Sequence, residues 1–205
     1  MEELSAMPDQ SRDHSAAERR AAIERAVFDI LVMIGEDPAR EGLRETPQRV
    51  ARMYDEILAG YHLDLRQQVN GALFDVTSSE IVVVKDIDFY SLCEHHMLPF
   101  WGEAHIAYMP KEKIIGLSKI SRIVDVFAKR LQIQERLTQQ IATAIDDIIV
   151  PHGCVVVVEA AHMCCTMRGV KKANTRMRTL VTTGVFKTDE GKRNEALFLL
   201  RSQLT

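Results

Sequence analysis

The sequence predicts an α+β fold in which a mainly antiparallel, four-stranded sheet carries helices on one face. Two observations support this: apolar residues recur either at helical spacing or in short β-branched runs, and these segments follow in the order helices, strands, helices, strands, helix. A doubly wound parallel sheet requires strict strand–helix alternation, which this order lacks. The outer strands of the sheet need covering, and pairing with a neighbouring subunit is one solution.

Two helices are expected first. Ser15 and Glu18 form a capping-box pattern, and the helix that follows ends at Gly35. Thr46 and Pro47 are typical of an N-cap with a first-turn proline, and they begin a second amphipathic helix. The residues expected to form the buried stripe of the first helix are Ile23, Val27, Ile30, Leu31 and Ile34.

The rest of the chain supplies the sheet. Strands are expected at 81–85, 103–109, 154–160 and 177–186. Further helices are expected from Ser118, as N-cap, to Leu131, from Leu137 to Ile148 and from Glu190 to Leu204. The segment between the first two strands, residues 86–102, holds a cysteine and two histidines and is expected to be a loop. We therefore expect a mobile tail over 1–14, a helical region over 15–60 and a main domain over 61–205.

Composition excludes several classes of protein. The 26 basic and 29 acidic residues give a net charge of -3, with a pI near 6.2, which argues against a general binder of nucleic acid or of anionic membranes. No apolar stretch approaches the roughly 20 residues that cross a bilayer, so we expect a cytoplasmic protein. In that reducing compartment the four cysteines are expected to bind metal, to act in catalysis or to be buried.

Two segments carry metal-ligand residues. Cys93 and His96 lie three positions apart in the expected loop, and Cys164 follows a β-prone run that ends near His162. Strand alternation would send His162 and Cys164 to one side. Cys93, His96 and Cys164 would form a Cys₂His zinc site whose fourth position is left to water, and such an ion lowers the pKa of that water towards roughly 7.

A closed structural zinc site is the alternative, with His95, His162 or Cys165 as fourth ligand. Because two histidines remain beside three ligands, and each could shuttle protons, the pattern favours catalysis. Cys165 faces the other way on a strand and is expected to be buried, as is Cys154.

A third group of residues could bind an anion and a base. Lys119 and Arg122 share a helical face, and Arg168 could join them; the alternative for each is a solvated surface charge. A carboxylate such as Glu135 can accept two parallel hydrogen bonds from guanine, and Gln134 offers a donor and an acceptor beside it. Gln-Glu at a helix start is equally typical of ordinary capping.

Together these motifs resemble a known family. The three motifs are CEHH, IGLSKISRIVDVFAKRLQIQERLTQQI and AHMCCTMRGV. In these motifs the chain resembles zinc-dependent GTP cyclohydrolase I, and the similarity extends in this chain from about Glu45 to the C-terminal helix. The resemblance implies opening of the guanine imidazole ring of GTP, loss of C8 as formate and rearrangement to 7,8-dihydroneopterin triphosphate, the first step towards pterins and tetrahydrofolate. It also implies that Cys93, His96 and Cys164 bind zinc and that His162 protonates N7.

The resemblance further implies how the substrate is held. Glu135 with Gln134 would bind guanine, and His95 and Ser118 would lie near the ribose; Glu94 would support the site or face the substrate. The residues implied for the triphosphate are Lys119, Arg122, Arg168, Arg49 and Arg52. The family's tunnelling fold closes into a barrel only when subunits associate, typically as a homodecamer of two pentamers with active sites between subunits. Cys165 beside Cys164 departs from a single-ligand pattern and leaves open which thiolate binds.

Two rival hypotheses remain on residues alone. A zinc deaminase would show H-x-E followed by P-C-x-x-C, and neither is present. A non-catalytic, zinc-stabilised nucleotide-binding oligomer would require neither His95 nor His162.

Overall fold

The chain divides into two compact units. The computed structural model describes residues 14–202, and the division falls after Ile57. The predicted boundary after residue 60 lies close to this division, and the predicted tail lies outside the described residues apart from His14. No helix within residues 14–202 combines the length and the apolar composition that crossing a membrane requires.

The N-terminal unit holds α1 (Ala16–Met33) and α2 (Thr46–Ile57). The capping box is confirmed: the Ser15 hydroxyl accepts from the Glu18 N–H at 3.2 Å, and the Ser15 N–H donates to the Glu18 carboxylate at 2.7 Å. These two bonds satisfy donors that would otherwise lack partners at the start of α1.

The apolar stripe of α1 differs from the prediction. Leu31 is buried, but Ile30 and Ile34 are exposed, because a unit of two helices offers too little surface to cover the whole stripe. Thr46 is the first residue of α2 rather than its cap, and Pro47 occupies the first turn as expected.

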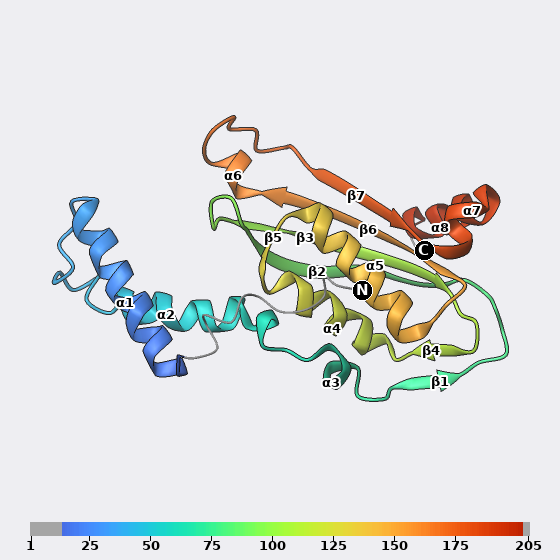
Figure 1. The fold of residues 1–205 in the computed structure, drawn as a ribbon. Coiled ribbons are helices and arrows are strands. Elements are labelled where there is room, and N and C mark those ends of the chain that lie inside the picture. The colour runs from blue at the N-terminus through green and yellow to red at the C-terminus, as the bar shows by residue number, and fades with distance from the viewer. Residues whose placement is uncertain (1–13, 203–205) are drawn as a thin grey trace. The chain divides into compact units, whose positions relative to one another are not determined.

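The second unit is built on a five-stranded sheet with the order β5-β2-β3-β6-β7 (Figure 1). All neighbouring strands pair antiparallel except β5, which runs parallel to β2. The strands of this sheet are β2 (Val82–Cys93), β3 (Pro99–Met109), β5 (Leu131–Gln132), β6 (Gly153–His162) and β7 (Met177–Thr182). A separate two-stranded sheet consists of β1 (Leu73–Asp75) and β4 (Lys113–Ile115). The α+β class and the mainly antiparallel sheet are confirmed, and β5 adds a fifth strand to the predicted four.

The helices of this unit cover both faces of the sheet. They are α3 (Leu65–Val69), α4 (Leu117–Ala128), α5 (Gln134–Ile149), α6 (Met163–Thr166), α7 (Gly184–Thr188) and α8 (Glu190–Arg201). Figure 1 shows α4 and α5 along one face, where they bury Phe89 and Val156. On the opposite face Val155 packs with Leu200 of α8, which differs from the predicted one-sided arrangement. The run of valines in β6 presents apolar side chains to both faces, so both require cover.

The expected loop over 86–102 is mostly strand. β2 continues to Cys93 and β3 begins at Pro99, so only residues 94–98 form a turn. Buried Ile87 and Phe89 alternate with exposed Asp88 along β2, which is the pattern of a strand with one covered face. The two strands therefore hold the CEHH segment at the tip of a rigid hairpin.

Candidate metal centre and its surroundings

The hairpin turn brings two candidate ligands together. The Cys93 N–H donates to the Leu98 carbonyl at 2.9 Å, and the Cys93 carbonyl accepts from the Met97 N–H at 2.8 Å. Met97 adopts a left-handed φ of 53° to close the turn. As a result Cys93, at the end of β2, and His96, in the turn, lie on the same side of the hairpin tip.

Cys164 completes a cluster of three donors. One ligand atom each from Cys93, His96 and Cys164 lies within 4.8 Å of the other two, and His95, His162 and Cys165 are not part of this cluster. Two sulfurs and one imidazole nitrogen are the donor set that zinc prefers in proteins. Burial raises the pKa of the Cys164 thiol to about 11, and the charge of neighbouring Cys93 adds to the effect. Two thiolates this close need a cation, so the donor set fits zinc.

Cys164 reaches the cluster in a way that strand alternation does not explain. β6 ends at His162, and residues 163–166 form the short helix α6, so the predicted alternation over this segment is wrong. Cys165 is exposed rather than buried, with its sulfur 4.0 Å from that of Cys164. Cys154 is buried as predicted, and burial raises the pKa of its thiol to about 12.

His162 lies at the end of β6, next to α6. Its ring stacks on Phe100 of β3, with 4.7 Å between ring centroids and planes 1° apart. Its Nε2 lies 2.9 Å from Oε1 of Gln134. Burial lowers the pKa of His162, and the negative charge of Glu135 opposes this. Phe100 therefore supports one face of the His162 ring, and Gln134 holds the ring at Nε2.

Gln134 and Glu135, the expected guanine pair, differ in their surroundings. Gln134 is 1% exposed, and its amide nitrogen donates to the Val158 carbonyl, the Met177 carbonyl and the Thr179 hydroxyl. Glu135, the next residue of α5, is exposed. Glu135 therefore presents its side chain to solvent, whereas Gln134 does not.

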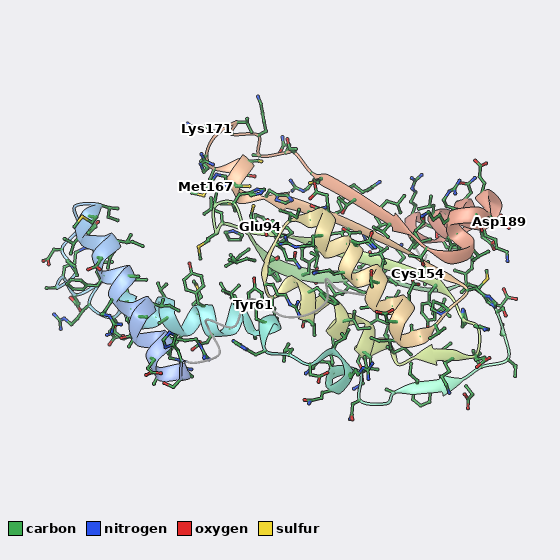
Figure 2. The ribbon with its side chains drawn as sticks, viewed as in Figure 1. Tyr61, Glu94, Cys154, Met167, Lys171 and Asp189 are labelled. Carbon is green, nitrogen blue, oxygen red and sulfur yellow. The ribbon has the colours of Figure 1, made fainter. Side chains whose placement is uncertain are left out.

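Glu94 is held by a residue that sequence reasoning missed. Its carboxylate pairs with the guanidinium of Arg136. Arg136 also donates to the Gln132 side chain at 2.9 Å and to the Leu131 carbonyl at 3.0 Å. These contacts tie the hairpin turn to the start of α5. Figure 2 labels Glu94 and Met167 at the same end of the sheet, where the hairpin and α6 meet.

The predicted anion-binding residues lie on different elements. Arg168 follows α6, and its guanidinium lies 2.8 Å from Nε2 of His96, so the structure brings it to the donor cluster. Lys119 and Arg122 lie on α4, and within the described residues neither forms a hydrogen bond or ion pair with the cluster. Ser118 is exposed as the second residue of α4, and Gly116 takes the N-cap position predicted for it.

The remaining predicted site residues are placed as follows. His95 is exposed in the hairpin turn, with its ring edge-on to His96 and 6.4 Å between centroids. Arg49 belongs to the N-terminal unit, where its guanidinium pairs with Glu45 at 2.8 Å. Arg52 is exposed on the same helix.

Comparison with known proteins gives consistent results. Residues 23–201 match the sequence family described as GTP cyclohydrolase I. GTP cyclohydrolase 1 of Leptospira biflexa is 54% identical over 180 residues, which cover 88% of this chain and 98% of the relative. GTP cyclohydrolase 1 of Thermoanaerobacter pseudethanolicus is 53% identical over 182 residues, covering 88% and 96% respectively. Among solved structures, that of an archaeosine synthase QueF-Like in the apo form aligns with 53% of this chain and 97% of its own, with a TM-score of 0.43 and 16% identity.

Proposed function

This chain belongs to the GTP cyclohydrolase I family, and we propose that Cys93, His96 and Cys164 hold the zinc ion that its activity requires. The activity is hydrolysis of GTP at guanine C8, with release of formate and rearrangement to 7,8-dihydroneopterin triphosphate. The rival hypotheses of a zinc deaminase and of a non-catalytic zinc protein are set aside. The observation that carries the site assignment is the convergence of three zinc-type donors from the end of β2, the hairpin turn and α6.

We propose that the zinc site is open. A closed site would need His95, His162 or Cys165 as a fourth ligand, and none of the three belongs to the donor cluster. Nε2 of His162 is engaged with Gln134. Zinc with three protein ligands lowers the pKa of a water molecule towards neutrality, and this is the chemistry that the ion supplies when bound.

His162 is proposed as the acid that protonates N7 of guanine. Its ring is rigid, because Phe100 supports its face and Gln134 holds its edge. It lies two residues before Cys164, so a base held beside the donor cluster would be within its reach. A group that must give up a proton near neutrality is helped by a lowered pKa, which burial gives His162.

Glu135 is proposed to hold the guanine edge through its exposed carboxylate. His95 and Ser118, both exposed, are proposed to lie near the ribose. Glu94 is proposed to support the site, because its ion pair with Arg136 fixes the hairpin turn that carries two zinc ligands.

The triphosphate is proposed to bind to cations from several elements. Arg168 lies beside the donor cluster, whereas Lys119 and Arg122 lie on α4 and Arg49 and Arg52 lie on α2. Cations on such separate elements can bind one triphosphate if different subunits contribute them to the same site.

We therefore propose a homodecamer of two pentameric rings with active sites between subunits. β7 is an edge strand of the sheet, so its outer backbone groups can pair with a strand of another copy. We also propose a cytoplasmic location, because the four cysteines are free thiols and two of them must stay reduced to bind zinc.

Two substitutions test this assignment. His162→Ala should keep stoichiometric zinc and lose GTP hydrolysis, whereas Cys164→Ala should lose both, because only the second removes a ligand. Zinc content is measured by atomic absorption, and turnover by formate and by the fluorescence of the oxidised pterin. Cys165→Ser is the matched control and should keep zinc and activity. Loss of zinc in Cys165→Ser with retention in Cys164→Ala would reverse the ligand assignment.

A further inference from the structure

We infer that Gln134 is a positioning residue that holds the imidazole of His162 as the Nε2–H tautomer and leaves Nδ1 as the nitrogen that faces a ligand. The inference assigns Gln134 a role other than base recognition. It rests on the proposed function, in which His162 acts on the substrate.

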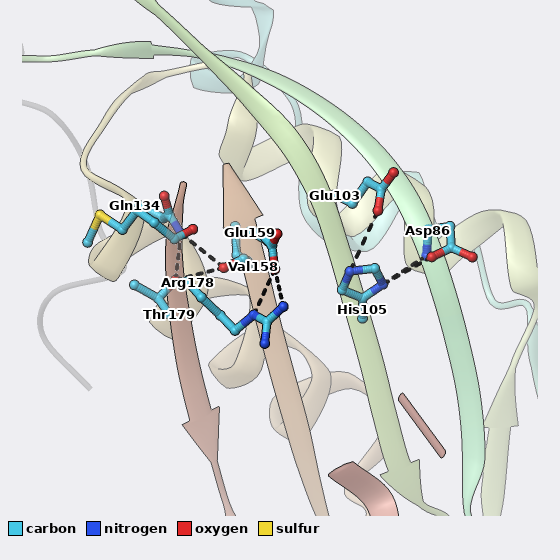
Figure 3. A network of polar contacts seen from close by, with 9 residues as sticks. Asp86, Glu103, His105, Gln134, Val158, Glu159, Arg178 and Thr179 are labelled. Atoms are coloured by element: carbon cyan, nitrogen blue, oxygen red, sulfur yellow. Dashed lines mark hydrogen bonds and ion pairs between the residues drawn. The ribbon is translucent and has the colours of Figure 1, made fainter. Parts of the chain in front are cut away.

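The first step is the orientation of the Gln134 amide. Its NH₂ group lies 2.9 Å from the Val158 carbonyl and 3.0 Å from the Met177 carbonyl, as Figure 3 shows for Val158 and Thr179 around Gln134. Backbone carbonyls can only accept hydrogen bonds, so the opposite orientation would place three oxygens against one another. The amide oxygen Oε1 must therefore face His162.

The second step follows from the chemistry of Oε1. An amide oxygen accepts and cannot donate, so the nitrogen at 2.9 Å, Nε2 of His162, carries the hydrogen. In a neutral imidazole only one nitrogen is protonated. In the neutral ring the lone pair of His162 therefore lies on Nδ1, and the contact with Gln134 selects this tautomer. The proton that His162 would give to N7 is then the Nδ1 proton of its imidazolium form, and the Nε2–H tautomer is the form left after the transfer.

The third step is the rigidity of the arrangement. Gln134 is 1% exposed, and its backbone carbonyl accepts from the Thr138 hydroxyl at 2.7 Å. The Thr138 and Thr179 hydroxyls lie 2.6 Å apart and link α5 to β7. Phe100, which is fully buried, stacks on the His162 ring from the other direction. Neither the amide nor the ring can turn without leaving a buried polar group unpaired.

The same surroundings explain why the residue is glutamine. A glutamate at this position would face two carbonyl oxygens with a buried carboxylate, which costs free energy. An aliphatic residue would remove the amide donor from both carbonyls and the acceptor from Nε2. The Gln134 side chain is enclosed, in contrast to exposed Glu135.

The tautomer is tested directly on the zinc-loaded protein. Histidine labelled with ¹⁵N at Nε2 alone is incorporated, and the His162 signal is assigned by its absence in His162→Ala. The expected ¹⁵N shift is that of a protonated ring nitrogen in the wild type. Gln134→Met, which has a similar length but no amide, should shift His162 towards a mixture of tautomers. A wild-type signal from unprotonated Nε2 would overturn the inference.

Kinetics separate positioning from base binding. Gln134→Met should lower kcat for GTP by about 10- to 100-fold, the usual effect of removing the partner that orients a functional histidine, and leave KM within about twofold. Gln134→Glu keeps an acceptor for Nε2–H and should recover the Nε2–H signal even if its activity is low. A KM that rises at unchanged kcat would instead show that Gln134 binds the base.

The matched control is Thr183→Val. It removes a hydroxyl that donates to Asp146 of α5 at 2.9 Å but belongs to none of the contacts of Gln134 or His162, so the tautomer and kcat should stay close to wild type. If Thr183→Val alters both as much as Gln134→Met does, the effect is general packing and the inference fails. The proposed function fails separately, if His162→Ala still hydrolyses GTP, whatever the ¹⁵N signal shows.

Discussion

At the scale of single residues, the donor cluster is governed by the cost of ionising two neighbouring thiols. Burial raises the pKa of Cys164 to about 11, and the Cys93 sulfur beside it adds to the shift. Without a cation the thiol is therefore protonated at neutral pH. Zinc binding must remove protons from the sulfurs, since thiolates are the ligands.

We expect zinc uptake at about pH 7 to release about two protons per chain. Affinity should rise with pH, because raising the pH through the range below the thiol pKa lowers the cost of deprotonation. Calorimetric titration in buffers of different ionisation enthalpy measures the number released. His162→Ala should release the same number and Cys164→Ala fewer. Uptake without proton release would contradict thiolate ligation.

The sequence predicted the zinc-type donors but not the contacts that order the side chains around them. Cys93 and His96 are close in the chain, and Cys and His are the usual zinc ligands, so residue type and spacing were sufficient. Gln134 and Arg136 act through backbone carbonyls and side chains on other elements, which no spacing rule reveals. A basic residue just after Gln-Glu at a helix start was the one signal for Arg136.

At the scale of elements, the tight pairing of β3 with β6 supports the hairpin that carries the ligands. Gly102 of β3 lies opposite Ala160, and a Cβ at Gly102 would lie 1.9 Å from the Glu159 carbonyl oxygen. The obstacle is strand backbone, which cannot retreat without breaking the ladder.

Gly102→Ala should therefore lower the free energy of unfolding by about 1–3 kcal/mol, as overpacking does in a close-packed interior. Gly42→Ala is the control, because its Cβ would meet only the tip of the exposed Arg40 side chain, at 3.1 Å; it should stay within about 0.5 kcal/mol of wild type. Denaturant unfolding followed by circular dichroism measures both. If Gly102→Ala and the wild type had the same free energy of unfolding, β3 and β6 would be able to move apart and accommodate the methyl group, which would contradict this prediction.

Most elements were predictable from apolar spacing, and the exceptions have physical causes. The sequence predicts a loop over residues 86–93, where the structure has a strand, because acidic and ligand residues obscure the alternation of buried Ile87 and Phe89. α6 was missed because one helical turn is too short to show a period. α8 covers the second sheet face because β6 is apolar on both sides, a pattern that does not indicate which helix will cover it.

At the scale of the whole molecule, the proposed binding residues lie on separate elements, which is why we propose active sites shared between subunits. The zinc cluster lies at the hairpin tip and α6, whereas Lys119 and Arg122 lie on α4 and form no hydrogen bond or ion pair with it in the described part of the chain. If neighbouring subunits combine them, each subunit completes a site of its neighbour.

Mixing two inactive variants tests this. Cys164→Ala lacks a zinc ligand, and the double variant Lys119→Ala, Arg122→Ala lacks part of the phosphate grip. Co-expressed in equal amounts, they should regain up to about a quarter of the wild-type activity, because random assembly gives each site a half chance of either intact part. Recovery near zero would place both parts of the site in one chain.

The most direct test of the central claim is X-ray absorption at the zinc edge of the loaded protein without substrate. We expect two sulfur ligands, one imidazole nitrogen and one oxygen from solvent, with the same spectrum for Cys165→Ser. A third sulfur, a second imidazole or a fourth ligand from any other side chain would show a closed zinc site and contradict the account.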